Sequence, residues 1–345
     1  MQVIEEWFIV KETFEKELRE RIVEINNEHE NKRYLPGYKL SNNLTVSNDI
    51  VEVATGKEFL IIAAPSLYLS STIKQIVNVP NIADGSTVVA ALTKGFVPSN
   101  DGPKLVLETI EAALPEVYKG QTVYISGPSH AEEVAMGKLT GLIAASENPK
   151  NSIRVRDLLR VPGLMVYSSF DVVGVQICAA AKNVIAVVYG AFDAVAEHSQ
   201  IFGDNSQSLL FAAGLNEIQA LGMAMGATHP ETFTSIAGVG DLDVTCKSEF
   251  GRNRRFGQDI IKTDILSNFK NIDDLIANIG ESLTSILDKI KNMLAEFEYF
   301  YNLEGQFVFQ RKKSFINTLW TPMLEGESED IDEDGNSIYY SEKSI

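Results

Sequence analysis

A single lysine stands in the middle of the apolar stretch CAAAKNVIAVVYG, which runs from Cys178 to Gly190. Its neighbours predict a helix that packs in the interior, so the ammonium group of Lys182 is expected to be largely removed from water. A desolvated lysine can exchange a proton near neutral pH, and a charged one can polarise a carbonyl group. The alternative is a lysine whose stem packs while its amino group reaches solvent. On the first interpretation, Lys182 is a candidate general acid/base.

Two further polar residues follow a glycine-rich turn in the stretch AGVGDLDVTC. Asp241 comes directly after Gly238 and Gly240, and Thr245 lies one helical turn beyond it. An aspartate after a glycine turn commonly caps a helix. It could equally be the partner that keeps a buried lysine charged and holds its orientation.

Three arginines occupy four consecutive positions in the stretch GRNRRFG, residues 251–257. A guanidinium group binds a phosphate through two parallel hydrogen bonds, so this cluster is a candidate anchor for a phosphorylated ligand. The alternative is a basic turn that is simply solvated. The net charge of −17 argues against binding to nucleic acid, although it does not exclude a small anionic substrate.

Polar residues also follow two predicted strands, at Thr93-Lys94-Gly95 and at Ser126-Gly127-Pro128-Ser129. Ligands of open α/β sheets bind beyond the carboxyl ends of the strands, which makes both turns candidate site segments. Taken alone, each could equally be an ordinary turn between a strand and a helix, because such turns are rich in Gly, Ser and Pro.

Other chemistries have little support in the sequence. The four histidines show no ligand spacing, and no HExxH, GxSxG or P-loop motif is present, so we expect no metal site. The stretch from Asp330 to Gly335 begins like a calcium loop, but Ser341 stands where the loop requires a glutamate, and a disordered acidic tail is the better interpretation. Two cysteines without a disulfide framework indicate a reducing, cytoplasmic compartment.

Short apolar runs alternate with helical patterns through the middle of the chain, which predicts a parallel α/β sheet domain. The predicted strands lie within 58–66, 86–95, 121–129, 140–148 and 164–169. Long helical patterns follow at 171–197 and 205–226, which predicts a second, all-helical domain. The pattern at 171–197 is interrupted by Gln176, Lys182, Asn183 and Asp193, so we expect a buried helix and no membrane span.

Taken together, these segments resemble the bacterial type of NAD(P)-dependent glycerol-3-phosphate dehydrogenase. The matching motifs are HENKRYLPG, AAPS, TKG, SGPSHAEEVAMG, GVQICAAAKNVIAV, AGVGDLDVTC and GRNRRFG. The resemblance spans about Ile25 to Phe256 and extends less closely to Gly280. It implies a Rossmann-like domain over 1–168, a helical substrate domain over 169–280 and a divergent acidic extension over 281–345.

The resemblance also implies a reaction, the reversible transfer of a hydride between NAD(P)H and C2 of dihydroxyacetone phosphate. The product, sn-glycerol 3-phosphate, is a precursor of glycerophospholipids. Lys182 would be the catalytic acid/base. The substrate would be bound by Lys94, Gly127, Ser129, Asn183, Asp241, Thr245, Arg252 and Asn253. The cofactor would be bound by Lys94, Ala131 and Arg252. The only partner implied is this phosphorylated triose, and a homodimer is possible.

The beginning of the chain departs from the family pattern. The first βαβ unit of a Rossmann fold carries a G-x-G-x-x-G turn that holds the cofactor pyrophosphate, whereas the first glycine here is Gly37. We therefore expect this unit to be missing or replaced. Two alternatives stay open: an inactive truncated or chimeric pseudoenzyme that retains the fold, and a related dehydrogenase with the same two-domain layout.

Overall fold

The computed structural model describes residues 18–99, 102–197, 202–249 and 251–262, together with the backbone of two short strands further on. These residues fall into two compact units. Unit 1 consists of Met1–Lys94 and Val106–Val175, and unit 2 of Gly95–Leu105 and Gln176–Ile345. The predicted combination of an α/β sheet domain and a helical domain is confirmed.

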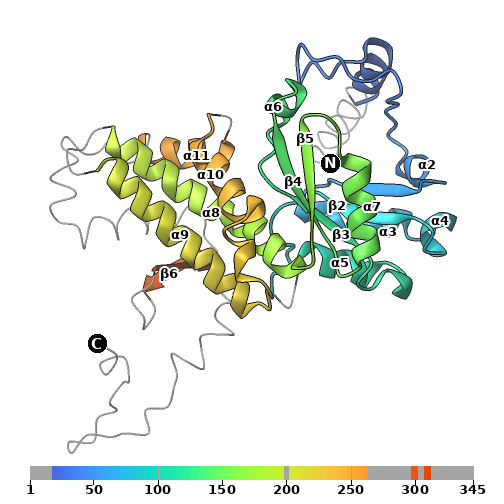
Figure 1. Ribbon diagram of the computed structural model, residues 1–345. Coiled ribbons are helices and arrows are strands. Elements are labelled where there is room, and N and C mark those ends of the chain that lie inside the picture. Colours follow the sequence, from blue (N-terminus) through green and yellow to red (C-terminus); the bar gives the residue numbers. More distant parts are fainter. Residues whose placement is uncertain are drawn as a thin grey trace, which may run out of the picture. The chain divides into compact units, whose positions relative to one another are not determined.

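Unit 1 is built on a five-stranded sheet with the strand order β1-β2-β3-β4-β5 (Figure 1). The strands are Phe59–Ile62, Val88–Ala91, Val123–Ser126, Thr140–Ala145 and Leu164–Ser169, as the apolar runs predict. All four residues of β2 and of β3 are buried, which explains why these strands are continuously apolar in sequence. One hydrophobic cluster on this sheet consists of Val88, Ala90, Val123, Ile125, Leu142, Ala144, Val155 and Val166.

The sheet is mixed, and in this respect the prediction of a parallel sheet is wrong. Strands β1, β2 and β3 are parallel, but β4 pairs with β3 in the antiparallel direction, with Ile125 opposite Ala144. The connection between them contains only the five-residue helix α6, Ala131–Ala135. Such a helix spans about 7 Å, too short to return the chain to the far end of the sheet for a parallel crossover. The longer helix α7, Pro149–Leu159, does so, and β5 is parallel to β4.

The remaining elements of unit 1 are short. A helix covers residues 18–28. The others are α2 (Ile50–Ala54), η1 (Ser66–Tyr68), α3 (Leu69–Ile76), α4 (Pro80–Ala83), α5 (Val106–Ala113) and η2 (Glu116–Tyr118). Helix α7 starts where the sequence provides a good cap, because the side chain of Asn148 accepts hydrogen bonds from the backbone of Lys150 and Asn151.

Between Gln176 and Lys262, the described part of unit 2 is helical. Its elements are α8 (Val172–Ala196, whose first residues belong to unit 1), α9 (Asp204–Ala224), η3 (Pro230–Thr232), η4 (Ile236–Gly240), α10 (Asp241–Lys247) and α11 (Arg252–Ile260). Helices α8 and α9 lie side by side and antiparallel (Figure 1), since Gly214 of α9 contacts Ile185 of α8 and Gly222 contacts Ile177. Gly214 allows the close approach, because a Cβ there would lie 2.7 Å from Ile185.

Helix α8 is the one helix within the described ranges whose length and composition would suffice to cross a membrane. Because 61% of its most apolar window is buried inside the protein, the expectation of a buried core helix fits better. Strands β6 (Phe297–Tyr301) and β7 (Phe307–Arg311) form an antiparallel pair. Apart from these two strands, the predicted extension over 281–345, including the calcium-loop-like Asp330 to Gly335, lies outside the described residues.

Candidate active site

Lys182 lies in the interior of unit 2, as its apolar neighbours predict. Only 5% of the residue is exposed, and its ammonium group forms an ion pair with Asp241, which is 1% exposed. Of the two interpretations of Asp241, a helix cap or a partner for the buried lysine, the structure therefore shows the partner. Two opposite charges in contact inside a protein stabilise each other's charged form, so the pair can hold the lysine as a proton donor.

A π-helical turn places Asp241 opposite Lys182. The turn η4 is Ile236–Gly240, and α10 begins directly after it. The turn is closely packed, because a Cβ on Gly238 would lie 2.0 Å from the carbonyl oxygen of Phe233. Short π-helical turns are frequent at functional sites, since the extra residue redirects the side chain that follows. One turn on, the buried Thr245 hydroxyl donates to the Asp241 carbonyl at 2.5 Å.

The amide side chains of Asn183 and Asn253 join the start of α11 to α8. Nδ2 of Asn253 donates to Oδ1 of Asn183 at 2.8 Å, although the two residues are 70 positions apart. Asn183 directly follows Lys182 on α8, and Arg252, whose side chain is exposed, directly precedes Asn253. The sequence-predicted residues of unit 2 are thus gathered on α8, α10 and α11. A buried cationic proton donor, two amides and a surface guanidinium suit the reduction of a carbonyl in an anionic ligand.

The arginine cluster divides into different roles that the sequence did not distinguish. Arg252 and Arg255 are exposed, whereas Arg254 forms an ion pair with the buried Asp193 of α8. Sequence reasoning assigned Asp193 no function. A signal for it was present, because Asp193 interrupts the same apolar stretch as Lys182 and lies three helical turns further along.

In unit 1, the predicted residues lie at the carboxyl ends of β2 and β3. Nζ of Lys94 donates to the carbonyl oxygen of Gly127 at 3.2 Å, and the hydroxyl of Ser129 donates to the same carbonyl at 3.3 Å. Ala131 is exposed and begins α6. Thr93 links this edge to β1, because its hydroxyl donates to the carbonyl of Ala64 at 2.7 Å. Since β1, β2 and β3 are parallel, these ends form the edge at which an open α/β sheet binds ligands.

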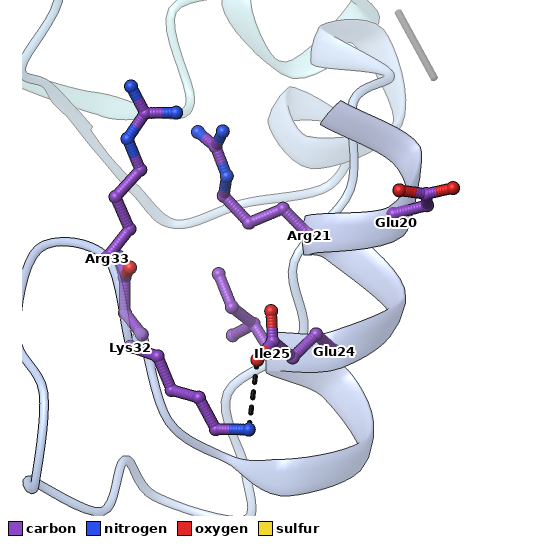
Figure 2. A pocket seen from close by; sticks show the side chains of 7 residues that line it. Glu20, Arg21, Glu24, Ile25, Lys32 and Arg33 are labelled. Atoms are coloured by element: carbon purple, nitrogen blue, oxygen red, sulfur yellow. Dashed lines mark ion pairs between the residues drawn. The ribbon is translucent and has the colours of Figure 1, made fainter. Parts of the chain in front are cut away.

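A separate pocket of about 230 Å³ lies in unit 1 between the helix over 18–28 and the turn that follows. Its lining residues are Glu20, Arg21, Glu24, Ile25, Asn31, Lys32 and Arg33, and all but Asn31 are labelled in Figure 2. The ammonium group of Lys32 pairs with Glu28 at 2.6 Å and with Glu24 at 3.0 Å, and hydrogen bonds to these carboxylates hold its pKa above the usual range. The predicted site residues do not line this pocket, so it is not the candidate active site.

Metal and thiol chemistry gain no support from the described residues. They contain no group of three or more His, Cys, Asp or Glu side chains arranged to hold a metal ion. Both cysteines are buried. Burial, and to a smaller extent the negative charges of Asp243 and Asp193, raise the pKa of the Cys246 thiol to about 12.

Comparison with known proteins shows which family has these features. Residues 9–152 match the family profile described as NAD-dependent glycerol-3-phosphate dehydrogenase N-terminus, and residues 171–299 match the corresponding C-terminus profile. The similarity therefore reaches further toward both ends of the chain than the motifs between Ile25 and Gly280 indicate.

Individual relatives agree with the profiles. The chain is 56% identical to a Treponema denticola protein named glycerol-3-phosphate dehydrogenase [NAD(P)+], over 74% of each chain. It is 52% identical to a Treponema pallidum protein of the same name, over 74% of this chain and 75% of that one. A crystal structure of glycerol-3-phosphate dehydrogenase from Coxiella burnetii is similar at 29% identity, with a TM-score of 0.63 and coverage of 80% of each chain.

Proposed function

Because the chain belongs to the NAD-dependent glycerol-3-phosphate dehydrogenase family, we propose that it interconverts dihydroxyacetone phosphate and sn-glycerol 3-phosphate. The observation that carries this proposal is the buried ion pair between Lys182 and Asp241. A buried charge pair is costly to build, and an equally large pair of apolar side chains would be as stable or more so. Its presence is therefore better explained by chemistry than by stability.

Lys182 supplies the proton in this proposal. Reduction of a ketone adds a hydride to the carbonyl carbon and leaves negative charge on the carbonyl oxygen, which must receive a proton. The Lys182 ammonium group donates this proton from Nζ, and it takes the proton back when the alcohol is oxidised. Asp241 keeps the lysine charged and fixes its direction, while Thr245 hydrogen-bonds to the Asp241 carbonyl and so steadies the first turn of α10.

The start of α11 binds the phosphate. Arg252 presents a guanidinium group at the surface, and Asn253 adds an amide whose position is set by its hydrogen bond to Asn183. A guanidinium group offers paired donors that match the oxygens of a phosphate. The net charge of −17 does not oppose this assignment, since the local groups are cationic or neutral.

The strand ends of unit 1 carry the remaining assignments. We assign Lys94, Gly127 and Ser129 to the substrate, and Lys94, Ala131 and Arg252 to the cofactor, which supplies the hydride when it is bound. Gly127 has φ 132°, a backbone conformation that favours glycine, so this strand end carries no Cβ at that position. These residues fit only part of a dinucleotide. No G-x-G-x-x-G turn occurs in the chain to hold a pyrophosphate, so the assigned residues leave that end of the cofactor without a binding turn.

The cofactor class, the cellular location and the oligomeric state complete the proposal. The relatives use NAD(P) by name, and we assign the same cofactor class here. We also propose a cytoplasmic location, supported by the two buried cysteines, which form no disulfide. A homodimer is the assembly we propose, and sedimentation equilibrium tests it.

Two measurements on the purified protein separate the parts of this proposal. Calorimetric titration with sn-glycerol 3-phosphate reports substrate binding, and loss of NAD(P)H absorbance with dihydroxyacetone phosphate reports hydride transfer. We expect both substrate binding and hydride transfer. We expect Lys182→Met to lower the rate of NAD(P)H oxidation by about 10²- to 10⁴-fold. Lys262→Met is the matched control, because Lys262 is an exposed lysine paired with Glu197 at 2.9 Å.

Each outcome has a distinct meaning. Substrate binding without NAD(P)H oxidation would show that the chain is a pseudoenzyme that retains only the substrate part of the family site. Failure to bind either triose phosphate would overturn the proposed function altogether. Equal rates for Lys182→Met and Lys262→Met would remove the assignment of Lys182.

A further inference from the structure

Asp193 lies on the same face of α8 as Lys182. The two are eleven positions apart, which is close to three full turns, so their Cα atoms are separated by about 16 Å along the helix axis. Asp193 is 9% exposed and therefore buried like the lysine. Its distance from Lys182 places it outside the proton-transfer site, so its charge requires another explanation.

The carboxylate of Asp193 binds side chains from two neighbouring helices. Oδ1 accepts a hydrogen bond from Nε2 of Gln207 on α9 at 2.7 Å. Oδ2 accepts from the guanidinium group of Arg254 and, at 3.1 Å, from Nε2 of Gln258, both on α11. The hydroxyl of Tyr189, one turn before Asp193 on α8, donates to Gln207 at 3.3 Å. One buried carboxylate thus joins α8, α9 and α11.

Arg254 extends this connection to α10. Nε and Nη2 of Arg254 contact the Asp193 carboxylate. Nη1 donates to the carbonyl oxygen of Lys247 at 3.0 Å. Lys247 is the last residue of α10, where carbonyl oxygens have no partner within the helix. The helix that holds Asp241 and the helix that holds Asn253 are therefore tied to α8 through a single guanidinium group.

The packing of α11 against α8 leaves little freedom for adjustment. A Cβ on Gly190 would lie 1.9 Å from the carbonyl oxygen of Arg254, and a Cβ on Gly257 would lie 1.9 Å from that of Val187. The two helix backbones are consequently in direct contact at both positions. A side chain that shifts α11 here moves Arg252 and Asn253, because these residues immediately precede Arg254.

We propose that Asp193 is a positioning residue for substrate binding: through Arg254 it fixes the first turn of α11, so that Arg252 and Asn253 meet the substrate phosphate. This inference rests on the proposed function, since it takes the phosphate to bind at the start of α11. Asp193 itself touches no substrate. Displacement of a binding group by about 1 Å can reduce a rate on the order of 100-fold, so an indirect contact of this kind has measurable consequences.

The test compares two ion pairs that join the same two helices. Asp193→Asn removes the buried charge. Glu197→Gln removes the matched exposed charge, because Glu197 directly follows α8 and pairs with Lys262, two residues beyond the end of α11, with side chains 51% and 42% exposed. The dissociation constant for sn-glycerol 3-phosphate is measured by calorimetry for both variants and for the unaltered chain, well below their unfolding temperatures. Where turnover is detectable, kcat and KM are measured separately.

We expect Asp193→Asn to weaken binding of sn-glycerol 3-phosphate about tenfold or more and to raise KM more than it lowers kcat, because the Lys182–Asp241 pair is left in place. Glu197→Gln should leave both unchanged. A merely structural role would lower the unfolding temperature and kcat without raising KM or the dissociation constant, and that result would overturn the proposal.

Arg254→Lys keeps the test decisive if Asp193→Asn does not fold. Lysine retains the positive charge beside Asp193, but it cannot reach Asp193 and the Lys247 carbonyl together with a planar fork. We expect the same rise in the dissociation constant, and an unchanged constant in a folded Arg254→Lys variant would also overturn the proposal. If the unaltered chain fails to bind sn-glycerol 3-phosphate, the proposed function fails first, which distinguishes the two failures.

Discussion

The two units hold their assigned residues by different forces. In unit 1 the strand ends are joined by side chains that bond to backbone carbonyls, such as Thr93 to Ala64 and Lys94 to Gly127. In unit 2 the residues are held by buried charges of opposite sign, Lys182 with Asp241 and Arg254 with Asp193. Losing a hydrogen bond to a backbone carbonyl leaves one uncharged oxygen unpaired, whereas losing one member of a buried ion pair leaves its partner as an uncompensated ion. Unit 2 should therefore be far more sensitive to single substitutions.

The largest effect is expected at the Lys182–Asp241 pair. Asp241→Asn leaves the Lys182 ammonium group buried without its counter-charge, which should lower the free energy of unfolding by about 3–5 kcal/mol. Urea denaturation measures the change. The double variant Lys182→Met with Asp241→Leu should recover most of this stability without recovering activity, since apolar side chains need no charge partner. If Asp241→Asn lowered the free energy of unfolding by less than about 1 kcal/mol, the value of one neutral hydrogen bond, the contrast between unit 2 and unit 1 would be contradicted.

Backbone contact between α8 and α11 should produce the second largest effect. Gly257→Ala places a Cβ 1.9 Å from the carbonyl oxygen of Val187, so one of the helices must move. Such overpacking typically costs about 1–3 kcal/mol. Gly203→Ala is the control, because a Cβ there has no neighbour within 4 Å and the backbone is extended. Equal unfolding temperatures for the two variants would mean that the helices have room to separate.

The elements were largely predictable from sequence, because their causes are local. Strands β2 and β3 are buried on both faces, so each is a continuous apolar run bounded by turn residues. The direction of β4 was not predictable in the same way, since periodicity identifies a strand without giving its orientation. Only the length of α6 indicates that the chain returns antiparallel, and a five-residue helix is hard to recognise in AEEVA.

The residues of the site were predictable individually, but their partners were not. Lys182 is conspicuous as a charge in an apolar helix, yet its counter-ion lies 59 positions further along the chain. Composition alone does not show which of the three arginines of GRNRRFG forms an ion pair within the protein. Only the packing of α11 shows that Arg254 is, because Asp193 is 61 positions away. Contacts of this range depend on tertiary structure that no local pattern encodes.

A smaller effect is expected at the strand ends of unit 1. Thr93→Val keeps the shape of the buried side chain and removes only its hydrogen bond to the Ala64 carbonyl, which should cost about 1 kcal/mol. Thr72→Val is the matched control, because the hydrogen bond from Thr72 to the Tyr68 carbonyl is exposed and water can replace it. If Thr93→Val destabilised the protein as much as Asp241→Asn, the contrast between the two units would be lost.

The last prediction concerns the rate at which the Cys246 thiol of the folded protein is labelled, where the smallest signal is expected. This rate shows whether the interior of unit 2 excludes water. Burial, and then the negative charges of Asp243 and Asp193, raise its pKa to about 12. Because the thiolate is the reactive form and only about one thiol in 10⁴ is ionised at pH 8, iodoacetamide should label the folded protein very slowly. Raising the pH should speed labelling up to the folded pKa, since the thiol loses its proton as pH increases. Mass spectrometry measures the modified fraction at Cys246.

The variant Asp241→Asn breaks the charge pair five residues before Cys246 on α10. Opening of unit 2 in this variant should expose the thiol and accelerate labelling. Rapid labelling of the unaltered protein would show that water already reaches this interior, and the large cost predicted for a lost charge would then have no physical basis.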